Sequence, residues 1–140
     1  MFKATALTTL MFFCLAACTD NKDSTGNRDL HWVALRTDTI NVVGLQDTLV
    51  IYQSVCRGCA YEGSTHFDVV DTSGNIQLTS ILTHDDNHEN TDGGSISKNL
   101  LLLASRTGTA EVRLYRFNTE QPTAEDSAKF TTYQILVNPK

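Results

Sequence analysis

From Leu30 onward, apolar residues recur mainly at every second position, and clusters of turn-forming residues interrupt them at intervals. This alternation is typical of β-strands with one buried face, and no long amphipathic helix is expected. The turn-forming residues at 71–75 separate two such segments. The expected strands are 48–53, 65–70, 76–83, 110–117 and 130–137, with edge strands at 30–35 and 39–43.

The alternation also predicts which side chains form the core. One face of each expected strand is apolar, while Glu111 and Arg113 are expected to point outward. The residues expected to point inward are Leu49, Ile51, Phe67, Val69, Ile76, Leu78, Leu82, Ala110, Val112, Leu114, Tyr133, Ile135 and Val137.

The run Leu100–Leu103 has no period, so by itself it is also compatible with a turn of buried helix. Its brevity and the flanking glycines Gly93, Gly94 and Gly108 favour a central strand buried on both sides. About seven or eight strands over residues 30–140 predict an all-β domain. The leading architecture is an immunoglobulin-like antiparallel β-sandwich, and a closed barrel is the alternative.

A short apolar segment follows Lys3 and ends in Leu-Ala-Ala before Cys18. Its fourteen uncharged residues, 4–17, are too few for a membrane-spanning helix, which needs about 20. The small residues before Cys18 are typical of a cleavage site. The segment resembles the signal of bacterial lipoproteins, in which the cysteine becomes an acylated N-terminus. An ordinary secretory signal with an incidental cysteine is the alternative.

Three regions are therefore expected along the chain. Residues 1–17 form a lipoprotein signal peptide, residues 18–29 a lipidated N-terminus with a flexible polar tether, and residues 30–140 the sandwich domain. Thr19, in place of an aspartate after Cys18, predicts sorting to the outer membrane, on its periplasmic face or at the cell surface. The expected location is the bacterial cell envelope, with the lipid anchor as the only contact with the membrane.

The chain has 140 residues, is 41% hydrophobic and carries a formal net charge of -5. The hydrophobic share excludes wholesale disorder, and the negative charge argues against nucleic acid as a partner, because phosphate binders carry basic patches. The sequence has no recognisable nucleophile elbow and no glycine-rich phosphate cradle. We therefore expect a protein that is not an enzyme and that needs no cofactor.

Of the four cysteines, only Cys56 and Cys59 remain for the folded domain, because Cys14 leaves with the signal peptide and Cys18 is acylated. Two cysteines separated by two residues in an oxidising compartment predict a disulfide that stiffens the loop 54–62. A thioredoxin-like redox pair is the alternative, but it requires a helix after the first cysteine. A closed zinc site requires four ligands, and no second pair lies at suitable spacing.

The segment 84–92 combines histidines with acidic residues. It lacks the glutamate that follows the first histidine in helical zinc hydrolases, and it does not match an EF-hand loop. We interpret it as a solvated acidic loop, assign no metal site to it and leave cation binding open. His31 and His66 lie in strand-like runs and are interpreted as packed or surface residues.

The second half of the sequence carries a resemblance to a known family. Its successive segments are the Gly93-Gly94 turn, an apolar strand at 97–104, Arg-Thr-Gly-Thr-Ala at 106–110, a strand at 111–117 and Lys-Phe-Thr-Thr-Tyr at 129–133. This order resembles the chagasin-like inhibitors of papain-type cysteine proteases. The resemblance covers about 92–137, and 39–52 looks like the family's opening strands. It implies a sandwich that lays three loops from one end across a protease cleft.

The resemblance also implies which residues contact the protease. The family's first loop reads Asn-Pro-Thr-Thr-Gly, whereas this loop starts at Ser54 or, shifted by a few residues, at Ala60; of the third-loop motif Arg-Pro-Trp only Arg116 is present. Arg116 and Phe117 are also open to interpretation as a rim arginine and a core aromatic. The residues assigned to protease contact are Ser54, Val55, Arg57, Gly58, Ala60, Tyr61, Gly63, Gly93, Gly94, Arg116 and Phe117.

The expected function is that of a membrane-anchored protein inhibitor of proteases, whose partner is a papain-like or other endopeptidase. A cell-surface binding or adhesion module without a protease target is the alternative from another class. A periplasmic structural partner is a third.

Overall fold

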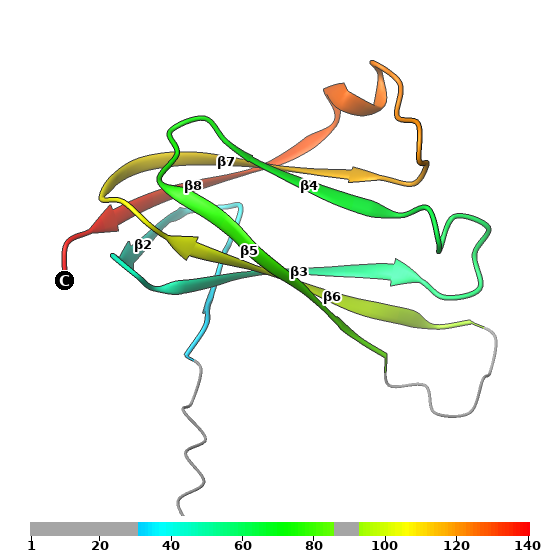
Figure 1. Cartoon of the computed structure of the whole chain (residues 1–140), viewed down its shortest axis with the longest axis horizontal. Helices are drawn as coiled ribbons and strands as arrows, with labels where there is room; N and C mark the ends of the chain where they lie inside the picture. The colour runs from blue at the N-terminus through cyan, green and yellow to red at the C-terminus, as the bar shows by residue number, and fades with distance from the viewer. Residues whose placement is uncertain (1–30, 86–92) are drawn as a thin grey trace, which may run out of the picture.

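Two four-stranded sheets pack face to face in the computed structural model, which describes residues 31–85 and 93–140 (Figure 1). One sheet has the order β1-β3-β6-β5 and the other the order β2-β8-β7-β4. The strands are β1 (Val33–Ala34), β2 (Ile40–Gly44), β3 (Thr48–Cys56), β4 (His66–Asp71), β5 (Ile76–His84), β6 (Ser95–Ala104), β7 (Gly108–Phe117) and β8 (Phe130–Asn138), with one 3-10 turn at Asp126–Ala128. The predicted all-β sandwich is confirmed.

Several predictions concern residues that lie outside the described part of the chain. The signal peptide 1–17, the acylated Cys18 and the tether up to residue 29 are among them, and so are residues 86–92 of the predicted acidic loop. These stay predictions. Within the described residues, no helix has the length and apolar character needed to cross a membrane.

The core lies between the two sheets and consists of alternate residues of the long strands, as the sequence pattern predicts. Phe67 and Ile76 are buried in the same cluster. The central strands contribute Leu49, Ile51 and Val55 from β3, Leu100, Leu102 and Ala104 from β6, Ala110, Val112 and Leu114 from β7, and Tyr133, Ile135 and Val137 from β8. The two sheets therefore share one apolar interior.

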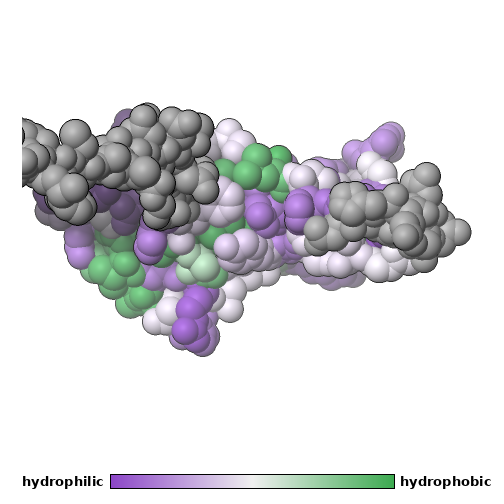
Figure 2. Space-filling model, turned by 90° about the horizontal axis from the view of Figure 1, so that it is seen from below, coloured by the Kyte–Doolittle hydropathy of each residue, from purple (hydrophilic) through white to green (hydrophobic). Residues whose placement is uncertain are grey.

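The four-leucine run lies at the centre of its sheet, because β6 pairs with β3 on one side and β5 on the other. Leu100 and Leu102 are fully buried in the core, whereas Leu101 and Leu103 are only half-buried on the outer face. The prediction of a central strand is confirmed, but burial on both sides is wrong. Seen from below, this side of the molecule shows hydrophobic patches interrupted by hydrophilic side chains (Figure 2).

The prediction for β5 needs a correction. A bulge between Leu78 and Ser80 shifts the register, so Ile81 pairs with the inward-facing Leu100 while Leu82 pairs with Asn99 on the other face. Leu78 and Leu82 are 39% and 42% exposed. Because β5 is an edge strand with a bulge, only Ile76 of the three predicted residues is buried.

The two N-terminal strands are edge strands, as predicted, but they pair in parallel. β1 is only two residues long and lies beside Leu49 and Val50 of β3, while β2 runs parallel to β8. The chain passes from one sheet to the other between β1 and β2, so these neighbours in sequence do not pair. The predicted antiparallel arrangement holds for the remaining pairs, β3–β6, β5–β6, β4–β7 and β7–β8.

Candidate functional site

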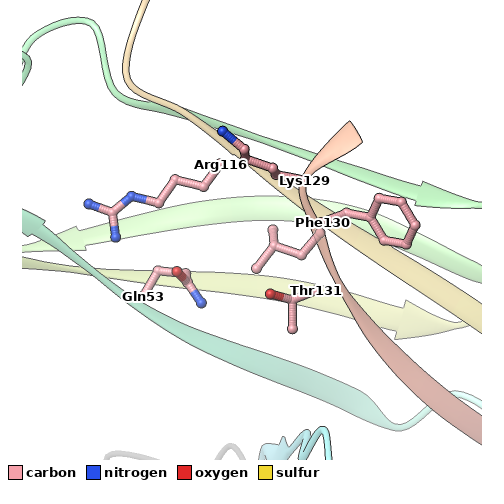
Figure 3. A pocket seen from close by; sticks show the side chains of 6 residues that line it. Gln53, Arg116, Lys129, Phe130 and Thr131 are labelled. Carbon is pink, nitrogen blue, oxygen red and sulfur yellow. The ribbon is translucent and has the colours of Figure 1, made fainter. Parts of the chain in front are cut away.

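The described surface that could receive a partner includes a pocket between the sheets, a second pocket of about 230 Å³ against the outer face of β4 and β7, and a group of three loops at one end. The pocket between the sheets has a volume of about 270 Å³ (Figure 3). Among the described residues, β1 pairs only with Leu49 and Val50 of β3, and β2 pairs only with residues 134–138 of β8. The pocket opens beyond them, beside Gln53 and Thr131, where neither short strand covers the edge of the sandwich. Its lining residues are Gln53, Leu114, Arg116, Lys129, Phe130 and Thr131.

The pocket between the sheets has a mixed polar and apolar lining, and its charged side chains are cations. Gln53 lies on the same face of β3 as the core residues Ile51 and Val55, so it points inward. In Figure 3 its side chain lies near that of Thr131. Lys129 donates a hydrogen bond to Glu125 over 3.0 Å, and Arg116 is exposed. The pocket can therefore admit a small polar or acidic group, but it offers no nucleophile paired with a base.

The strand register brings three connections to the same end of the sandwich. Cys56, the last residue of β3, lies opposite Ser95, the first residue of β6, and β5 ends beside them at His84. In the other sheet, His66 at the start of β4 pairs with Phe117 at the end of β7. We call these connections the first loop (57–65), the second loop (85–94) and the third loop (118–129); all three leave the right-hand end in Figure 1.

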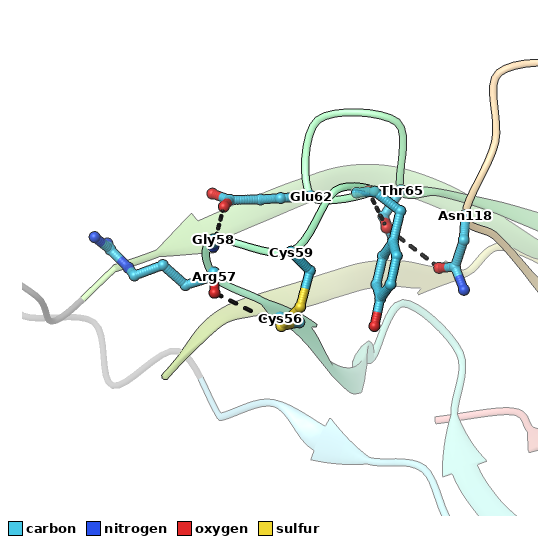
Figure 4. The surroundings of a disulfide bond; sticks show 8 residues. Cys56, Arg57, Gly58, Cys59, Glu62, Thr65 and Asn118 are labelled. Atoms are coloured by element: carbon cyan, nitrogen blue, oxygen red, sulfur yellow. Dashed lines mark hydrogen bonds between the residues drawn. A yellow bond between two sulfur atoms is a disulfide. The ribbon is translucent and has the colours of Figure 1, made fainter. Parts of the chain in front are cut away.

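The first loop is held by a disulfide and by bonds within its own backbone (Figure 4). Cys56 and Cys59 are joined, with their Cα atoms 5.7 Å apart, which confirms the predicted disulfide. The Gly58 N–H donates to Glu62 Oε2 over 2.6 Å, and the Glu62 N–H donates to the Cys59 carbonyl over 3.0 Å. The loop therefore has a defined conformation before any partner arrives.

A second set of bonds closes the far half of the first loop. The Tyr61 carbonyl accepts one hydrogen bond from the Thr65 N–H at 2.9 Å and another from Thr65 Oγ1 at 2.7 Å. The Tyr61 side chain itself is exposed. The backbone on either side of Tyr61 is thus fixed while its ring points to solvent.

The first loop is bonded to the second loop. The Arg57 N–H donates to the Gly94 carbonyl over 3.1 Å, and the Arg57 guanidinium forms an ion pair with Asp85. The Arg57 side chain is only 15% exposed, so this pair is partly shielded from water. Asp85 and Gly94, which lie near the two ends of the second loop, are thus both bonded to the first loop.

The first loop is also bonded to the third loop. Ser64 Oγ donates to the Asn118 carbonyl over 2.8 Å, and Thr65 Oγ1 lies 3.2 Å from Asn118 Oδ1. The first loop is therefore the middle member of the group and contacts the other two. The described residues of the three loops thus lie together at this end of the sandwich.

The structure places most of the predicted contact residues at this end of the sandwich, with two corrections. Val55 is 1% exposed and points into the core from β3, and Phe117 is 5% exposed beneath the rings of His66 and Tyr115. The buried Val55 side chain cannot reach a partner, so its assignment to contact is wrong. Phe117 is buried as the alternative interpretation expects, but it lies on the outer face of its sheet and not in the core, so its assignment to contact is not supported either. Arg57 is mostly buried. The exposed members are Ser54, Gly58, Ala60, Tyr61, Gly63, Gly93, Gly94 and Arg116.

Several residues that hold the loops were not predicted from the sequence. Asp85 and Asn118 bond to first-loop residues from the other two loops, and Glu62 and Thr65 bond within the first loop. Only Glu62 carried a local signal, because it follows Gly58 by four residues within a short loop. In residues 31–85 and 93–140, no group of three or more potential metal ligands occurs.

In comparisons of sequence, no family model and no curated protein matches the chain. In comparisons of structure, the chain is similar to the cysteine protease inhibitor EhICP2 from Entamoeba histolytica, with a TM-score of 0.56 and 10% identity over 76% of this chain and 96% of that one. The solution structure of amebosin also matches, with a TM-score of 0.49 and 14% identity over 78% of this chain and 96% of that one. The protein therefore shares the fold of a cysteine protease inhibitor, as the sequence resemblance implied.

Proposed function

We propose that this protein inhibits cysteine proteases by laying its three connected loops across the active-site cleft. The observation that carries the proposal is the bonding of the first loop to both of its neighbours through Arg57, Ser64 and Thr65. The likeness of the fold to a cysteine protease inhibitor supports the same conclusion.

The physical advantage of connected loops is preorganisation. A loop that is mobile before binding loses conformational freedom in the complex, at about 1–2 kcal/mol per ordered residue. Loops already fixed by a disulfide and by hydrogen bonds lose less, so more of the interaction energy appears as affinity. An interface of roughly 800 Å² on each partner is then sufficient for tight binding.

The exposed residues of the surface have the character that a narrow cleft requires. Gly58, Gly63, Gly93 and Gly94 have no side chains, so the loop backbones can approach the walls of a cleft closely. Tyr61 supplies an aromatic ring on a fixed backbone. Aromatic side chains are frequent anchors in protein interfaces.

The proposal extends to the location of the inhibitor. Acylation of Cys18 would hold the domain on the bacterial envelope, and a polar tether up to residue 29 would let it reach proteases in the surrounding space. Labelling of growing cells with a radioactive fatty acid would test this part. Loss of the label in a Cys18→Ala variant is the expected result, and label that persists in the variant would contradict it.

Titration of a papain-type protease tests the function. The full chain, kept soluble in mild detergent, is added in increasing amounts to papain at a fixed concentration, and hydrolysis of a fluorogenic peptide is followed. We expect activity to fall linearly to near zero at about one inhibitor per active site, with the inhibitor remaining intact on a gel. Full activity at a tenfold excess of the chain, across several papain-type proteases, would overturn the proposal.

The alternative, a surface binding or adhesion module, calls for an exposed apolar sheet face. The exposed apolar residues of the described chain are instead spread over both sheets, such as Ile40 and Val42 on β2 and Phe130 on β8 in one sheet, and Tyr52 on β3 and Leu82 on β5 in the other. This division gives the alternative no single surface, and we keep inhibition as the conclusion.

A further inference from the structure

We propose that the Cys56–Cys59 disulfide exchanges with the catalytic thiolate of the inhibited protease and forms a mixed disulfide with it. This inference rests on the proposed function. It assigns the first loop a covalent step in addition to occupation of the cleft, and it makes this disulfide a modification site as well as a cross-link.

The position of the disulfide carries the inference. It lies in the middle loop of the three, which contacts the second loop through Arg57 and the third loop through Ser64. A surface of three loops that spans a cleft places its middle loop over the centre, where the catalytic cysteine of such a protease lies. Cys56 and Cys59 are both partly exposed, so an approaching sulfur atom can reach them.

The exchange step is balanced without any further reagent. The protease thiolate attacks Sγ of Cys59, the Cys56–Cys59 bond breaks, and its electron pair leaves with Cys56 as a thiolate, which then takes a proton from water. One disulfide is lost and one is formed, so there is no net oxidation. Papain-type proteases hold the attacking cysteine as a thiolate beside a histidine, and binding in the cleft brings the reacting sulfurs together.

The attack is directed to Cys59 by the way the two cysteines are held. Cys56 is the last residue of β3 and pairs with Ser95 in the sheet ladder, whereas Cys59 lies within the loop. Cys59 can therefore move with the protease while Cys56 stays in place.

Most of the loop keeps its shape when the disulfide opens, because bonds independent of the sulfurs hold it, and only the one or two residues around Cys59 are released. The Gly58 N–H remains bonded to Glu62, and the Tyr61 carbonyl remains bonded to Thr65. The exchanged loop thus stays in the cleft. The same bonds keep Cys56 near Cys59, so the Cys56 thiolate can attack back and release an active protease. The mixed disulfide is therefore in equilibrium with the closed loop, and detecting it requires a trap.

The test traps the freed Cys56 thiol. Papain is activated with a thiol, the thiol is removed by desalting, and the enzyme is mixed in mild detergent with an equal amount of the full chain, in which Cys14→Ser and Cys18→Ser leave Cys56 and Cys59 as the only cysteines. Excess N-ethylmaleimide is added at intervals, and the products are measured by intact mass spectrometry and by electrophoresis without reductant. Two controls run in parallel: papain blocked beforehand with iodoacetamide, and the Cys56→Ser/Cys59→Ser variant.

We expect a species with the summed mass of the two chains plus one maleimide on Cys56. Dithiothreitol should reduce this species to the two separate chains, and peptide mapping should show Cys59 linked to the catalytic cysteine. Neither control should form the species. Papain that the chain with the intact disulfide inhibits, with no covalent species at any time, would overturn the exchange and leave the proposed function standing, whether or not the double variant inhibits less. Papain that neither chain inhibits would overturn the proposed function and this inference together.

Discussion

The backbone N–H of Arg57 donates a hydrogen bond to the carbonyl of Gly94 over 3.1 Å. This bond continues the pairing of β3 with β6 by one step past Cys56 and Ser95, into the loops. Because a sheet ladder is rigid, the first and second loops begin from a fixed mutual position. The ion pair of Arg57 with Asp85 then ties the opposite side of the second loop to the same residue.

The Arg57–Asp85 pair should stabilise the domain measurably. Arg57 Nε is buried without a hydrogen-bond partner among the described residues, so Asp85 supplies much of the compensation for burying this guanidinium. We expect Asp85→Asn to lower the free energy of unfolding by about 1–2 kcal/mol, between the values for exposed and for buried ion pairs. Chemical denaturation with urea measures it.

The matched control is the exposed pair of Arg36 with Asp38, which has the same chemistry at 3.0 Å. Asp38→Asn should leave the urea midpoint unchanged, because both side chains are well exposed to water. Equal effects of the two substitutions would contradict the role assigned to Arg57.

Gly94 should be intolerant of a side chain. Its φ of +86° lies in the left-handed region, where a residue other than glycine is strained by about 1 kcal/mol or more. We expect Gly94→Ala to weaken inhibition of papain at least about fivefold, because relief of the strain moves the carbonyl that Arg57 binds. Gly74 is the control, since its φ of +71° carries the same strain and a Cβ there meets no atom within 4 Å. It lies in the turn between β4 and β5, outside the three loops, so Gly74→Ala should leave inhibition unchanged. An inhibition constant unaltered by Gly94→Ala would count against a fixed second loop.

Removal of the disulfide should affect inhibition more than folding. The Cys56→Ser/Cys59→Ser variant keeps the whole strand register, and so small a ring contributes at most about 2 kcal/mol to stability. We expect the melting temperature to fall by a few degrees and reversible inhibition of papain to weaken about tenfold, because one or two residues of the first loop become mobile. Calorimetry and an equilibrium inhibition assay measure the two effects. Proportionate losses in both would make the bridge merely a structural cross-link.

Much of the fold was predictable because most strands have one face in the core and the other toward water, so their apolar residues alternate along the sequence. In β7, Ala110, Val112 and Leu114 alternate with polar residues, and all three are buried in the core. The end of β3 was not predictable from the alternation, because a polar side chain occupies an inward-facing position there. Gln53 faces inward at the open pocket, so the apolar pattern ends there although the strand continues to Cys56. Val55 was therefore assigned to a loop and to contact.

The connections within the candidate site were not predictable in the same way. Arg57 and Asp85 are brought together by the pairing of β3 and β5 with β6, and neither residue has a sequence neighbour that signals the contact. The prediction that Phe117 contacts the protease failed for a different reason. It follows an arginine, as in the resembled family's third loop, but it lies on the outer face of its sheet, where His66 and Tyr115 cover it.

The bulge in β5 gives a direct test of the corrected orientation of Leu82. Leu102 is fully buried and Leu82 is 42% exposed, although the sequence pattern assigns both to the core. We expect Leu102→Ala to cost about 2–5 kcal/mol of unfolding free energy and Leu82→Ala less than about 1 kcal/mol. Denaturation with guanidinium chloride distinguishes them. A large loss of unfolding free energy for Leu82→Ala would contradict the bulge and support the regular strand that the sequence predicts.

The turn after β4 should make stability depend on acidity. Burial alone would raise the pKa of Asp71, but bonds from Ser73 and from the Ile76 N–H, at 2.6–2.9 Å, outweigh it and lower this pKa below 3.8. A carboxyl with a lowered pKa in the folded state stabilises the fold above its unfolded pKa, and this contribution is lost as the pH falls through the folded value. Stability should therefore decline from about pH 5 downward.

The variant Asp71→Asn tests this dependence, because an amide does not titrate in this range. We expect it to cost about 1 kcal/mol at pH 7, since water competes for the bonds of a partly exposed carboxylate, and to lose less further stability than wild type between pH 5 and pH 3. The stability of the variant should still fall somewhat with pH, because two other carboxyls also have lowered pKa values. Asp47 accepts a bond from Lys140, and Asp126 accepts bonds from Thr123. Urea midpoints at several pH values give both curves. Parallel curves for wild type and variant would show that the Asp71 turn does not contribute to the acid sensitivity of the fold.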